Sequence, residues 1–254
     1  MISIYKNNQL QKCQSLLDAM EQLTGAIASS VAPVISIVGA GGKTTFMHRL
    51  ADEYVQSGRN VIVTTTTHIV NEEHPFFLSD NNVSLEETRI ILRQYGQVWV
   101  GVTALKGKMR KLPDSVLQEL FSLGNPIIIE ADGAKRLPVK VPAEHEPVIV
   151  EESTHLVNVY GLDAIGKPLK DVCFRFQLAA TVLNKHENDL FEAEDLVTLA
   201  KSKRAGKKGV SKTMKYFVVL NKADNEQRIQ MAESIAKQLY EEGIDQVIIS
   251  SFDR

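Results

Sequence analysis

Cysteine is scarce in this chain of 254 residues, which contains only Cys13 and Cys173. Two cysteines so far apart fit no CxxC pattern, so a zinc site built on thiolates is not expected, and we interpret both as ordinary thiols. Long apolar runs are absent too: nowhere do about 18 apolar residues follow one another, and no cationic segment precedes an apolar one at the start. We therefore expect a cytoplasmic protein with no membrane partner.

Neither sign of charge is in clear excess. The 29 lysines and arginines and the 31 acidic residues give a formal net charge of -2. Neither nucleic acid nor an anionic membrane is favoured as a bulk electrostatic partner by that balance. Hydrophobic residues make up 44% of the chain, which is enough for a sizeable core, and no repeat or low-complexity linker divides it. Residues 1–254 are therefore predicted to form a single domain.

Segments of strand and helix character alternate along most of the chain. The predicted strands are 34–39, 60–68, 97–102, 125–133, 155–161, 216–221 and 246–251. The predicted helices are 9–24, 43–56, 86–94, 113–123 and two within 174–200. Connections are expected at 25–33, at a basic loop containing Lys106, Lys108, Arg110 and Lys111, and at 201–215, a flexible loop in which seven of fifteen residues are cationic. This order predicts an α/β fold, a P-loop NTPase-like three-layer sandwich with a mostly parallel sheet and helices on both faces.

The strongest local signal is the sequence VISIVGAGGKTT at residues 34–45, where a strand breaks into glycines and then opens a helix. Glycines free the backbone to turn its N–H groups toward an anion, and the helix start adds the positive end of its dipole. We expect an exposed Lys43 to reach the β- and γ-phosphates and the Thr44 hydroxyl to bind Mg²⁺. The predicted nucleotide-binding residues here are Gly39, Ala40, Gly41, Gly42, Lys43, Thr44 and Thr45.

The glycine loop departs from the Walker A pattern GxxxxGK[ST], because Ile37 stands where the first glycine belongs. It is two residues short, and in this it resembles the loop of Mur-type amide ligases. The alternative interpretation is that a glycine-rich turn between strand and helix serves packing alone.

A second group of polar residues follows the apolar run Ile127–Ile129, which is typical of a fully buried parallel strand. Glu130 and Asp132 lie at its carboxyl end, as in a Walker B strand that holds Mg²⁺ through a carboxylate. We predict that both are catalytic and metal-binding and leave open which one organises the metal. Thr66, among the four threonines that end the strand before His68, is a further predicted metal ligand, although threonine also simply favours strands. The alternative is that the two carboxylates merely end a strand.

Cations follow these carboxylates in a proline-punctuated loop. Lys135 is predicted to be catalytic, since a cation here can neutralise a transferring phosphate. The candidate substrate-binding residues are His68, Arg136, Lys140, His145 and Glu146. Each of these is equally compatible with ordinary surface charge.

The sequence NKAD at residues 221–224 follows a predicted strand, and Ser250 ends the next one. In GTPases the aspartate of NKxD pairs with guanine and a serine loop one unit later contacts the base. Asn221, Lys222, Asp224 and Ser250 are therefore predicted to bind the base, and GTP is slightly favoured over ATP. The alternative is a turn in which Asp224 or Asn225 caps the next helix.

Four segments, GAGGKTT, VTTTTH, EADGAKRLPVKVPAEHEPVI and NKAD, together resemble the YqeC-type accessory proteins of selenium-dependent molybdenum hydroxylases along nearly the whole chain. The segment 130–149 is the most specific part, and its ExxG also resembles the metallochaperone GTPases. The resemblance implies help in maturing a selenium-containing molybdenum cofactor, with the hydroxylase or its cofactor as partner. The residues themselves predict a site for Mg²⁺ and a nucleoside triphosphate. Hydrolysis, phosphoryl transfer to a small anionic acceptor, and non-catalytic nucleotide sensing all stay open.

The motifs also predict one geometric relation. The carboxyl ends of parallel strands meet at one edge of a sheet, where α/β proteins bind ligands. The strand ends at Gly39, Thr67, Asp132 and Asn221 are therefore expected along the same edge.

Overall fold

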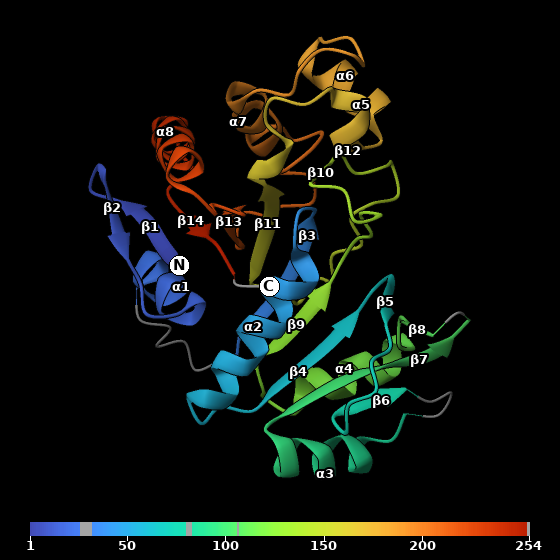
Figure 1. Cartoon of the computed structure of the whole chain (residues 1–254). Helices are drawn as coiled ribbons and strands as arrows, with labels where there is room; N and C mark the ends of the chain where they lie inside the picture. The colour runs from blue at the N-terminus through green and yellow to red at the C-terminus, as the bar shows by residue number, and fades with distance from the viewer. Residues whose placement is uncertain (26–31, 80–82, 106, 253–254) are drawn as a thin grey trace.

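The computed structural model describes residues 1–25, 32–79, 83–105 and 107–252 (Figure 1). Twelve strands in these ranges form one large sheet. From one edge to the other its order is β2 (Gln9–Lys12), β1 (Ile2–Lys6), β14 (Val247–Ser250), β13 (Lys215–Asn221), β11 (His155–Gly161), β3 (Val34–Gly39), β9 (Ile127–Glu130), β4 (Val61–Thr65), β7 (Gln97–Ala104), β8 (Lys108–Arg110) and β5 (His68–Val70). Strand β6 (Phe77–Ser79) pairs with β7, also in parallel.

All neighbours from β14 to β7 are parallel, and only the outer strands β1, β2, β5 and β8 join antiparallel. A small second sheet pairs β10 (Val139–Lys140) with β12 (Cys173–Phe174) in parallel. The helices are α1 (Leu16–Thr24), α2 (Lys43–Gln56), α3 (Leu85–Tyr95), α4 (Asp114–Ser122), the short η1 (Leu162–Ala164) and α5 (Leu169–Val172), α6 (Phe176–Leu183), α7 (Ala193–Lys201) and α8 (Glu226–Glu241).

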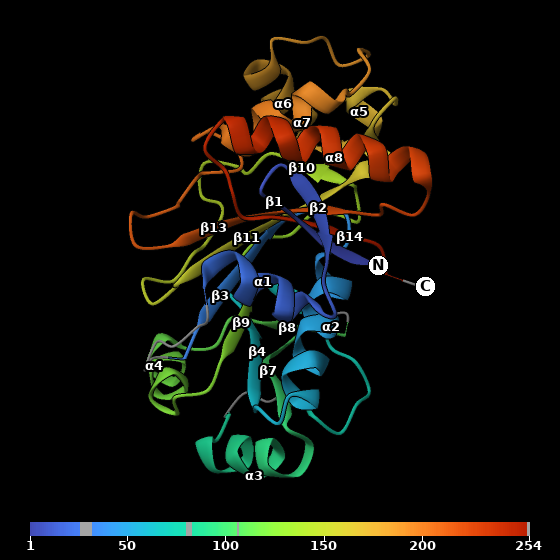
Figure 2. The ribbon, with the colours of Figure 1, turned by 90° about the vertical axis from the view of Figure 1, so that its left-hand side faces the viewer.

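The helices cover both faces of the sheet, as Figure 2 shows. Side chains of a strand alternate between the faces, and β9 makes this explicit. Ile128 packs into the apolar cluster that includes helices α1 and α2, whereas Ile127 and Ile129 pack into the cluster that includes α3 and α4. Farther along that second face, α7 and α8 cover β11, β13 and β14. The chain is thus an α/β protein with a large, mostly parallel central sheet, as the alternation predicts.

The prediction of one helix over 9–24 is wrong in its first part. Residues Gln9–Lys12 form β2, which returns along β1 through a tight turn, and the helix begins only at Leu16. Asn7 and Asn8 adopt φ values of 54° and 60°, the left-handed conformation that a two-residue hairpin turn requires. Ser15 then starts the helix, because its side chain accepts a hydrogen bond from the Asp18 N–H.

Three predicted connections have different outcomes. Of the predicted basic loop, Lys108 and Arg110 lie in strand β8 instead, because β8 turns back along β7, and Lys106 lies outside the described residues. Within the predicted connection 25–33, residues 26–31 also lie outside them. Residues 202–214 form a series of turns between α7 and β13, and their flexibility stays a prediction.

The carboxyl ends of the parallel strands meet at one edge of the sheet, and two contacts there join distant motifs. The Gly39 N–H donates to Asp132 Oδ2 at 3.1 Å, and Asn221 Nδ2 donates to the Gly41 carbonyl at 2.9 Å. Thr65 of β4 is in register with Glu130 of β9, so the strand before Thr67 ends at this edge too. The predicted gathering of the strand ends at Gly39, Thr67, Asp132 and Asn221 is therefore confirmed. Among the described residues, no helix has the length and apolar character needed to cross a membrane.

Candidate functional site

The glycine loop between β3 and α2 is closely packed against neighbouring backbone. Gly39, Gly41 and Gly42 have φ values of 89°, 79° and 125°, which favour glycine strongly. A Cβ atom on Gly41 would collide with the backbone of Gly161 and with the Pro138 carbonyl. The Gly41 N–H donates to the Leu137 carbonyl at 3.0 Å, so the loop is anchored to the segment that follows Asp132.

The start of helix α2 offers N–H groups to an anion. Gly42 is the N-cap and has no side chain with which to cap the helix. The first N–H groups of any helix lack partners within the helix and carry the positive end of its dipole. Thr44 and Thr45 are exposed in this first turn. The backbone geometry therefore suits a phosphate at this place.

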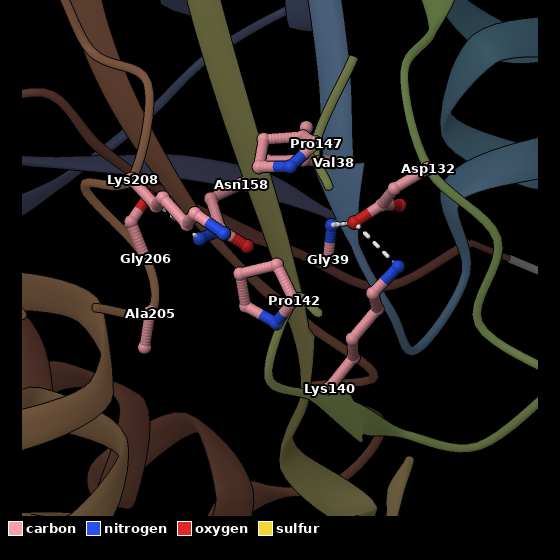
Figure 3. Close-up of a pocket in the computed structure, with 10 residues that line it drawn as sticks. All are labelled: Val38, Gly39, Asp132, Lys140, Pro142, Pro147, Asn158, Ala205, Gly206 and Lys208. Atoms are coloured by element: carbon pink, nitrogen blue, oxygen red, sulfur yellow. Dashed lines mark hydrogen bonds and ion pairs between the residues drawn. The ribbon is translucent and has the colours of Figure 1, made fainter. Parts of the chain in front are cut away.

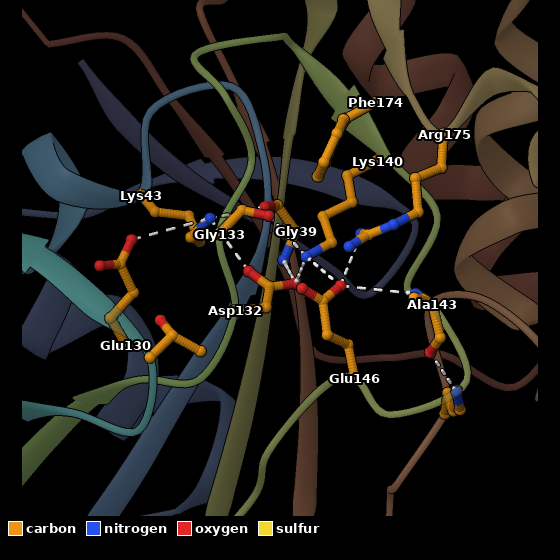
Figure 4. A network of polar contacts seen from close by, with 12 residues as sticks. Gly39, Lys43, Glu130, Asp132, Gly133, Lys140, Ala143, Glu146, Phe174 and Arg175 are labelled. Atoms are coloured by element: carbon orange, nitrogen blue, oxygen red, sulfur yellow. Dashed lines mark hydrogen bonds and ion pairs between the residues drawn. The ribbon is translucent and has the colours of Figure 1, made fainter. Parts of the chain in front are cut away.

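Lys43 is buried, and our expectation of an exposed lysine is wrong. Its Nζ donates to the Gly39 carbonyl at 2.7 Å and lies 3.0 Å from Asp132 Oδ1 and 3.8 Å from Glu130 Oε1. The physical reason is the adjacency of β3 and β9, which brings two carboxylates to the lysine. Figure 4 shows Lys43 between the two acidic side chains.

Asp132 is the more tightly bound of the two carboxylates. Its Oδ2 accepts from the Gly39 N–H and pairs with Lys140 Nζ at 3.0 Å. Its Oδ1 is buried and, within the described part of the chain, has no hydrogen bond of good geometry, although Lys43 is close. A buried carboxylate oxygen with free coordination capacity is the kind of ligand that Mg²⁺ takes.

Glu130 is less firmly held. Burial raises the pKa of Glu130 to about 7. The positive charge of Lys43, and to a lesser extent those of Lys140 and Lys108, lowers this pKa, whereas the negative charge of Asp132 raises it. The side chain therefore exchanges a proton near neutral pH, as a general acid or base must. Its sole ion pair among the described residues is the 3.8 Å contact with Lys43.

Lys140 and Glu146 lie together next to Asp132. The Lys140 side chain is fully buried, and its Nζ contacts Asp132 Oδ2, Glu146 Oε2 at 2.8 Å and the Gly133 carbonyl at 2.6 Å. Burial opposes ionisation of Glu146, but hydrogen bonds from Lys140 and Arg175 outweigh it and lower its pKa. We predicted both residues as substrate contacts, but their side chains form an ion pair with each other instead. The reason is that Lys140 lies in the buried strand β10.

The other predicted residues make no ion pair with this network within the described ranges. His68 is exposed on β5 at the sheet edge, beside an open depression of about 510 Å³ that Thr103 and Arg110 also line. His145 is exposed as well.

The Thr66 hydroxyl, a predicted metal ligand, donates to the Val148 carbonyl at 2.7 Å. Lys135 and Arg136 are exposed in consecutive left-handed conformations, with φ values of 47° and 62°.

The NKAD segment lies beside the glycine loop. Asn221 joins them, because Ser250 Oγ donates to its Oδ1 at 3.0 Å while its Nδ2 holds the Gly41 carbonyl. Lys222 pairs with Asp163 at 2.7 Å. Asp224 is exposed and accepts from the Ser251 hydroxyl at 2.7 Å. The cap of helix α8 is Asn225, whose side chain accepts from the Arg228 N–H, so Asp224 is not needed for capping.

Sequence reasoning missed Phe174 and Arg175. The Arg175 guanidinium lies 4.3 Å from the Phe174 ring centroid, and its Nη1 donates to Glu146 Oε2 at 2.6 Å. Both residues reach the network because β12 pairs with β10, with Phe174 in register with Lys140. A two-residue strand pair leaves no periodic signal in the sequence.

A small cavity lies behind Gly39 (Figure 3). Its volume of about 10 Å³ is sufficient for a single water. Asn158 Oδ1 lies buried beside it with no hydrogen-bond partner in the described ranges, while its Nδ2 donates to the Tyr160 hydroxyl at 3.0 Å. A water here would satisfy Asn158, and the cavity is too small for a substrate.

The fold and the site define an α/β protein in which a glycine loop between strand and helix faces two carboxylates from the adjacent strand. The family model described as YqeC protein matches residues 35–177, so the chain belongs to the YqeC family. A relative from Escherichia coli (strain K12), "Uncharacterized protein YqeC", is 28% identical over 202 residues, which cover 78% of each chain. The family match includes the glycine loop, the carboxylates and Arg175, and ends before Asn221.

Proposed function

We propose that this protein binds a nucleoside triphosphate, GTP in preference to ATP, together with Mg²⁺ and hydrolyses it. The observation that supports this most directly is the 3.0 Å contact between Lys43, at the start of α2, and Asp132, beyond the neighbouring strand β9. A lysine at a glycine-rich helix start and a carboxylate on the adjacent parallel strand are the two parts that phosphoryl chemistry requires.

The residues present fit such a ligand. Phosphates would lie against the N–H groups of the first turn of α2, and Lys43 would exchange its contact with Asp132 for them. That exchange would free Asp132 Oδ1 for the metal, with the exposed Thr44 hydroxyl as a second oxygen ligand. The metal would supply positive charge against the phosphates. Glu130, whose pKa is near 7, would orient or deprotonate the attacking water, and Lys135 would neutralise transferred charge.

For the biological role we infer assistance in maturing the selenium-containing molybdenum cofactor of selenium-dependent hydroxylases. This part rests on the family resemblance, and nucleotide turnover would drive the maturation step. One observation favours a second candidate, phosphoryl transfer or ligation involving a small anionic acceptor. Arg175 and Phe174 place an additional cationic surface next to Lys140 and Asp132.

A thermal-shift panel with ATP, GTP and CTP, each with and without Mg²⁺, tests the proposal. A ligand at 100 times its Kd adds about 2.7 kcal/mol to stability, so the unfolding midpoint should rise with GTP and Mg²⁺. Lys43→Ala should abolish this rise, whereas Lys212→Ala, which removes an exposed lysine in the turns before β13, should retain it. Because Lys43 is buried against two carboxylates, the variant's own midpoint should be lower and serves as its baseline.

Turnover then distinguishes the candidate roles. Phosphate release without an acceptor favours hydrolysis, and release that requires an anionic acceptor favours transfer. Tight binding without turnover would indicate a nucleotide sensor. No midpoint change with any nucleotide would refute the nucleotide site.

A further inference from the structure

Three cations surround a single aromatic ring beside the candidate nucleotide site. The Phe174 ring centroid lies 4.3 Å from the Arg175 guanidinium, 5.0 Å from Lys135 Nζ and 5.8 Å from Lys140 Nζ. We propose that Arg175, Lys135 and Phe174 form a second anion-binding site, and that its ligand is the phosphate group of a small molecule other than the nucleotide. The proposal deepens the proposed function, since it assigns the substrate class of the same active region.

The cations are not balanced by the carboxylates around them. Glu146 is shared between Lys140 and Arg175, and Asp132 is shared between Lys140 and Lys43. Lys135 is exposed and makes no ion pair within the described chain. Like charges gathered at one ring repel each other, and each cation–π contact stabilises the arrangement by only about 0.5–2 kcal/mol. An anion between Lys135 and Arg175 would relieve this repulsion.

The charges at the ring bear on the ligand's own charge. Three cations, Lys135, Lys140 and Arg175, lie at the Phe174 ring, and their carboxylate partners among the described residues are Glu146 and Asp132, of which Asp132 is also paired with Lys43. The surroundings of the ring therefore hold at least one positive charge in excess. A phosphate monoester carries about two negative charges at neutral pH and is attracted to this excess more strongly than a carboxylate, which carries one.

Arginine chemistry also favours an oxyanion. Of the guanidinium's five N–H donors, one of the two on Nη1 contacts Glu146 and helps to hold the group in place. The guanidinium carbon lies over the Phe174 ring, which restrains the position of the group, and the N–H donors of a guanidinium form a planar fork. Such a fork matches two oxygens of a phosphate.

Backbone strain concentrates at the same residues. Lys135, Arg136 and Arg175 have φ values of 47°, 62° and 63°, in a region that residues other than glycine seldom adopt. Strain of this kind persists where surrounding structure imposes it, and it is frequent at ligand sites. Here the β10–β12 pair and the Gly41–Leu137 hydrogen bond impose it from two sides.

The second site is connected to the first through charged groups. Figure 4 shows the sequence of contacts from Lys43 to Asp132, Lys140, Glu146 and Arg175. The phosphate-bearing ligand would therefore lie on the Lys140 side of Asp132, opposite Lys43. This is the position of an acceptor or an effector beside the bound nucleotide.

Isothermal titration calorimetry with inorganic phosphate as the probe tests the site in the full chain. Arg175→Ala should weaken phosphate binding at least tenfold, Lys135→Ala should weaken it less, and Arg175→Lys should recover only part because it lacks the fork. Arg204→Ala removes an exposed arginine in the turns after α7 and should bind phosphate as the wild type does. Acetate should bind more weakly than phosphate throughout. A thermal midpoint for each variant shows that it is folded.

The results separate this proposal from that for the nucleotide. Arg175→Ala should keep the thermal shift caused by GTP and Mg²⁺, and Lys43→Ala should keep the phosphate binding that depends on Arg175. Phosphate binding that is absent in the wild type, equal in folded Arg175→Ala, or lost only in Lys43→Ala would overturn the second site. If no nucleotide shifts the midpoint while phosphate binding still requires Arg175, the second site stands and the nucleotide function fails.

Discussion

Glu130 and Asp132 are two residues apart but have different surroundings. Asp132 is held by a backbone N–H and by two buried lysines, each 3.0 Å away. Glu130 has one lysine at 3.8 Å, and burial raises its pKa to about 7. The first environment gives the carboxylate three close donors that fix its position, whereas the second raises the pKa of the carboxyl enough for proton exchange near neutral pH. We therefore propose that Asp132 would bind the metal and that Glu130 would orient or deprotonate the water.

Substitution of each carboxylate by its amide tests this division. Asp132→Asn should abolish the Mg²⁺-dependent part of nucleotide affinity and lower the unfolding free energy, since it removes a charge that two buried lysines share. Glu130→Gln resembles the protonated form of Glu130 and should change affinity by less than about threefold while it slows turnover at least about 100-fold. Calorimetry with and without Mg²⁺, together with single-turnover rates, measures both effects. Equal losses of binding and rate in both variants would contradict the assignment.

At this scale the sequence predicted the residues better than their contacts. The position of the glycines and of Asp132 at strand ends along one edge of the sheet follows from strand and helix patterns. The burial of Lys43 does not, because it depends on which strand lies next to β3, and β9 is almost 90 residues away in the chain. Arg175 escaped notice for the same reason, since the β10–β12 pair brings it to Glu146.

At the scale of elements, the glycine loop, the carboxyl end of β11 and the segment before β10 form one packed unit. Gly41 lies against Gly161, and the Gly161 N–H donates to the Pro138 carbonyl at 2.9 Å. The loop therefore has its shape before any ligand arrives. That preorganisation lowers the entropy cost of binding a phosphate.

Alanine substitutions at two glycines with similar backbone conformations test how tightly the loop is packed. Gly41 and Gly58 have φ values of 79° and 76°, but a Cβ on Gly58 would meet nothing within 4 Å. Gly58→Ala should lower the free energy of unfolding by about 1–2 kcal/mol, because only the backbone is strained. Gly41→Ala should lower it by about 1–3 kcal/mol more, because the added Cβ overpacks the loop, and it should also abolish nucleotide binding. Urea denaturation compares the two, and equal losses of stability would show that the loop is not tightly packed.

Strand β11 begins with a buried histidine that links stability to pH. Burial lowers the pKa of His155 to about 4, with a smaller effect of Lys215, and the ring lies 5.8 Å from that of Phe217. The unfolded chain, with a histidine pKa near 6.5, binds more protons below that pH than the folded chain does. The contribution of the neutral histidine to the free energy of unfolding is therefore fully present above pH 6.5, and it is lost as the pH falls toward 4.

The stability lost through His155 amounts to about 3 kcal/mol, because its pKa differs between the unfolded and folded chains and each pKa unit corresponds to about 1.36 kcal/mol. His155→Gln should remove that part of the acid dependence, whereas His145→Gln, at an exposed position, should leave it in place. Urea midpoints between pH 4 and 7 give the comparison. An unchanged slope in His155→Gln would assign the acid sensitivity to other groups.

For the whole molecule, the order of the strands decides where a nucleotide would lie. Strand β11 separates β3 from β13, so the ends of β3 and β13 are about 10 Å apart at a spacing of roughly 4.8 Å between neighbours. Phosphates at the end of β3 and a base at the end of β13 would have the ribose across β11. The parallel order follows from alternation of strands and helices, but the insertion of β11 between these two strands was beyond sequence patterns.

The base itself is the final test of this arrangement. Asp224 is exposed near the ends of β13 and β14, where Ser251 and Arg228 hold its carboxylate. A carboxylate accepts from both the N1–H and the exocyclic amine of guanine, whereas adenine presents an unprotonated N1 to it. A bound base would cover this carboxylate and remove its water, and leaving it unsatisfied would then cost at least about 1.4 kcal/mol, so GTP should bind at least about tenfold more tightly than ATP.

Asp224→Asn should transfer the preference toward xanthosine triphosphate, because the C2 carbonyl of xanthine replaces the amine and can accept from the new amide. The helix cap would survive this change, since Asn225 and not Asp224 caps α8. Asn225→Ala serves as the matched control: it should lower stability by about 1 kcal/mol and leave base choice unchanged. Competition of each triphosphate against labelled GTP measures the preference. ATP that displaces GTP at equal concentration would show that the NKAD segment is a turn and no guanine pocket.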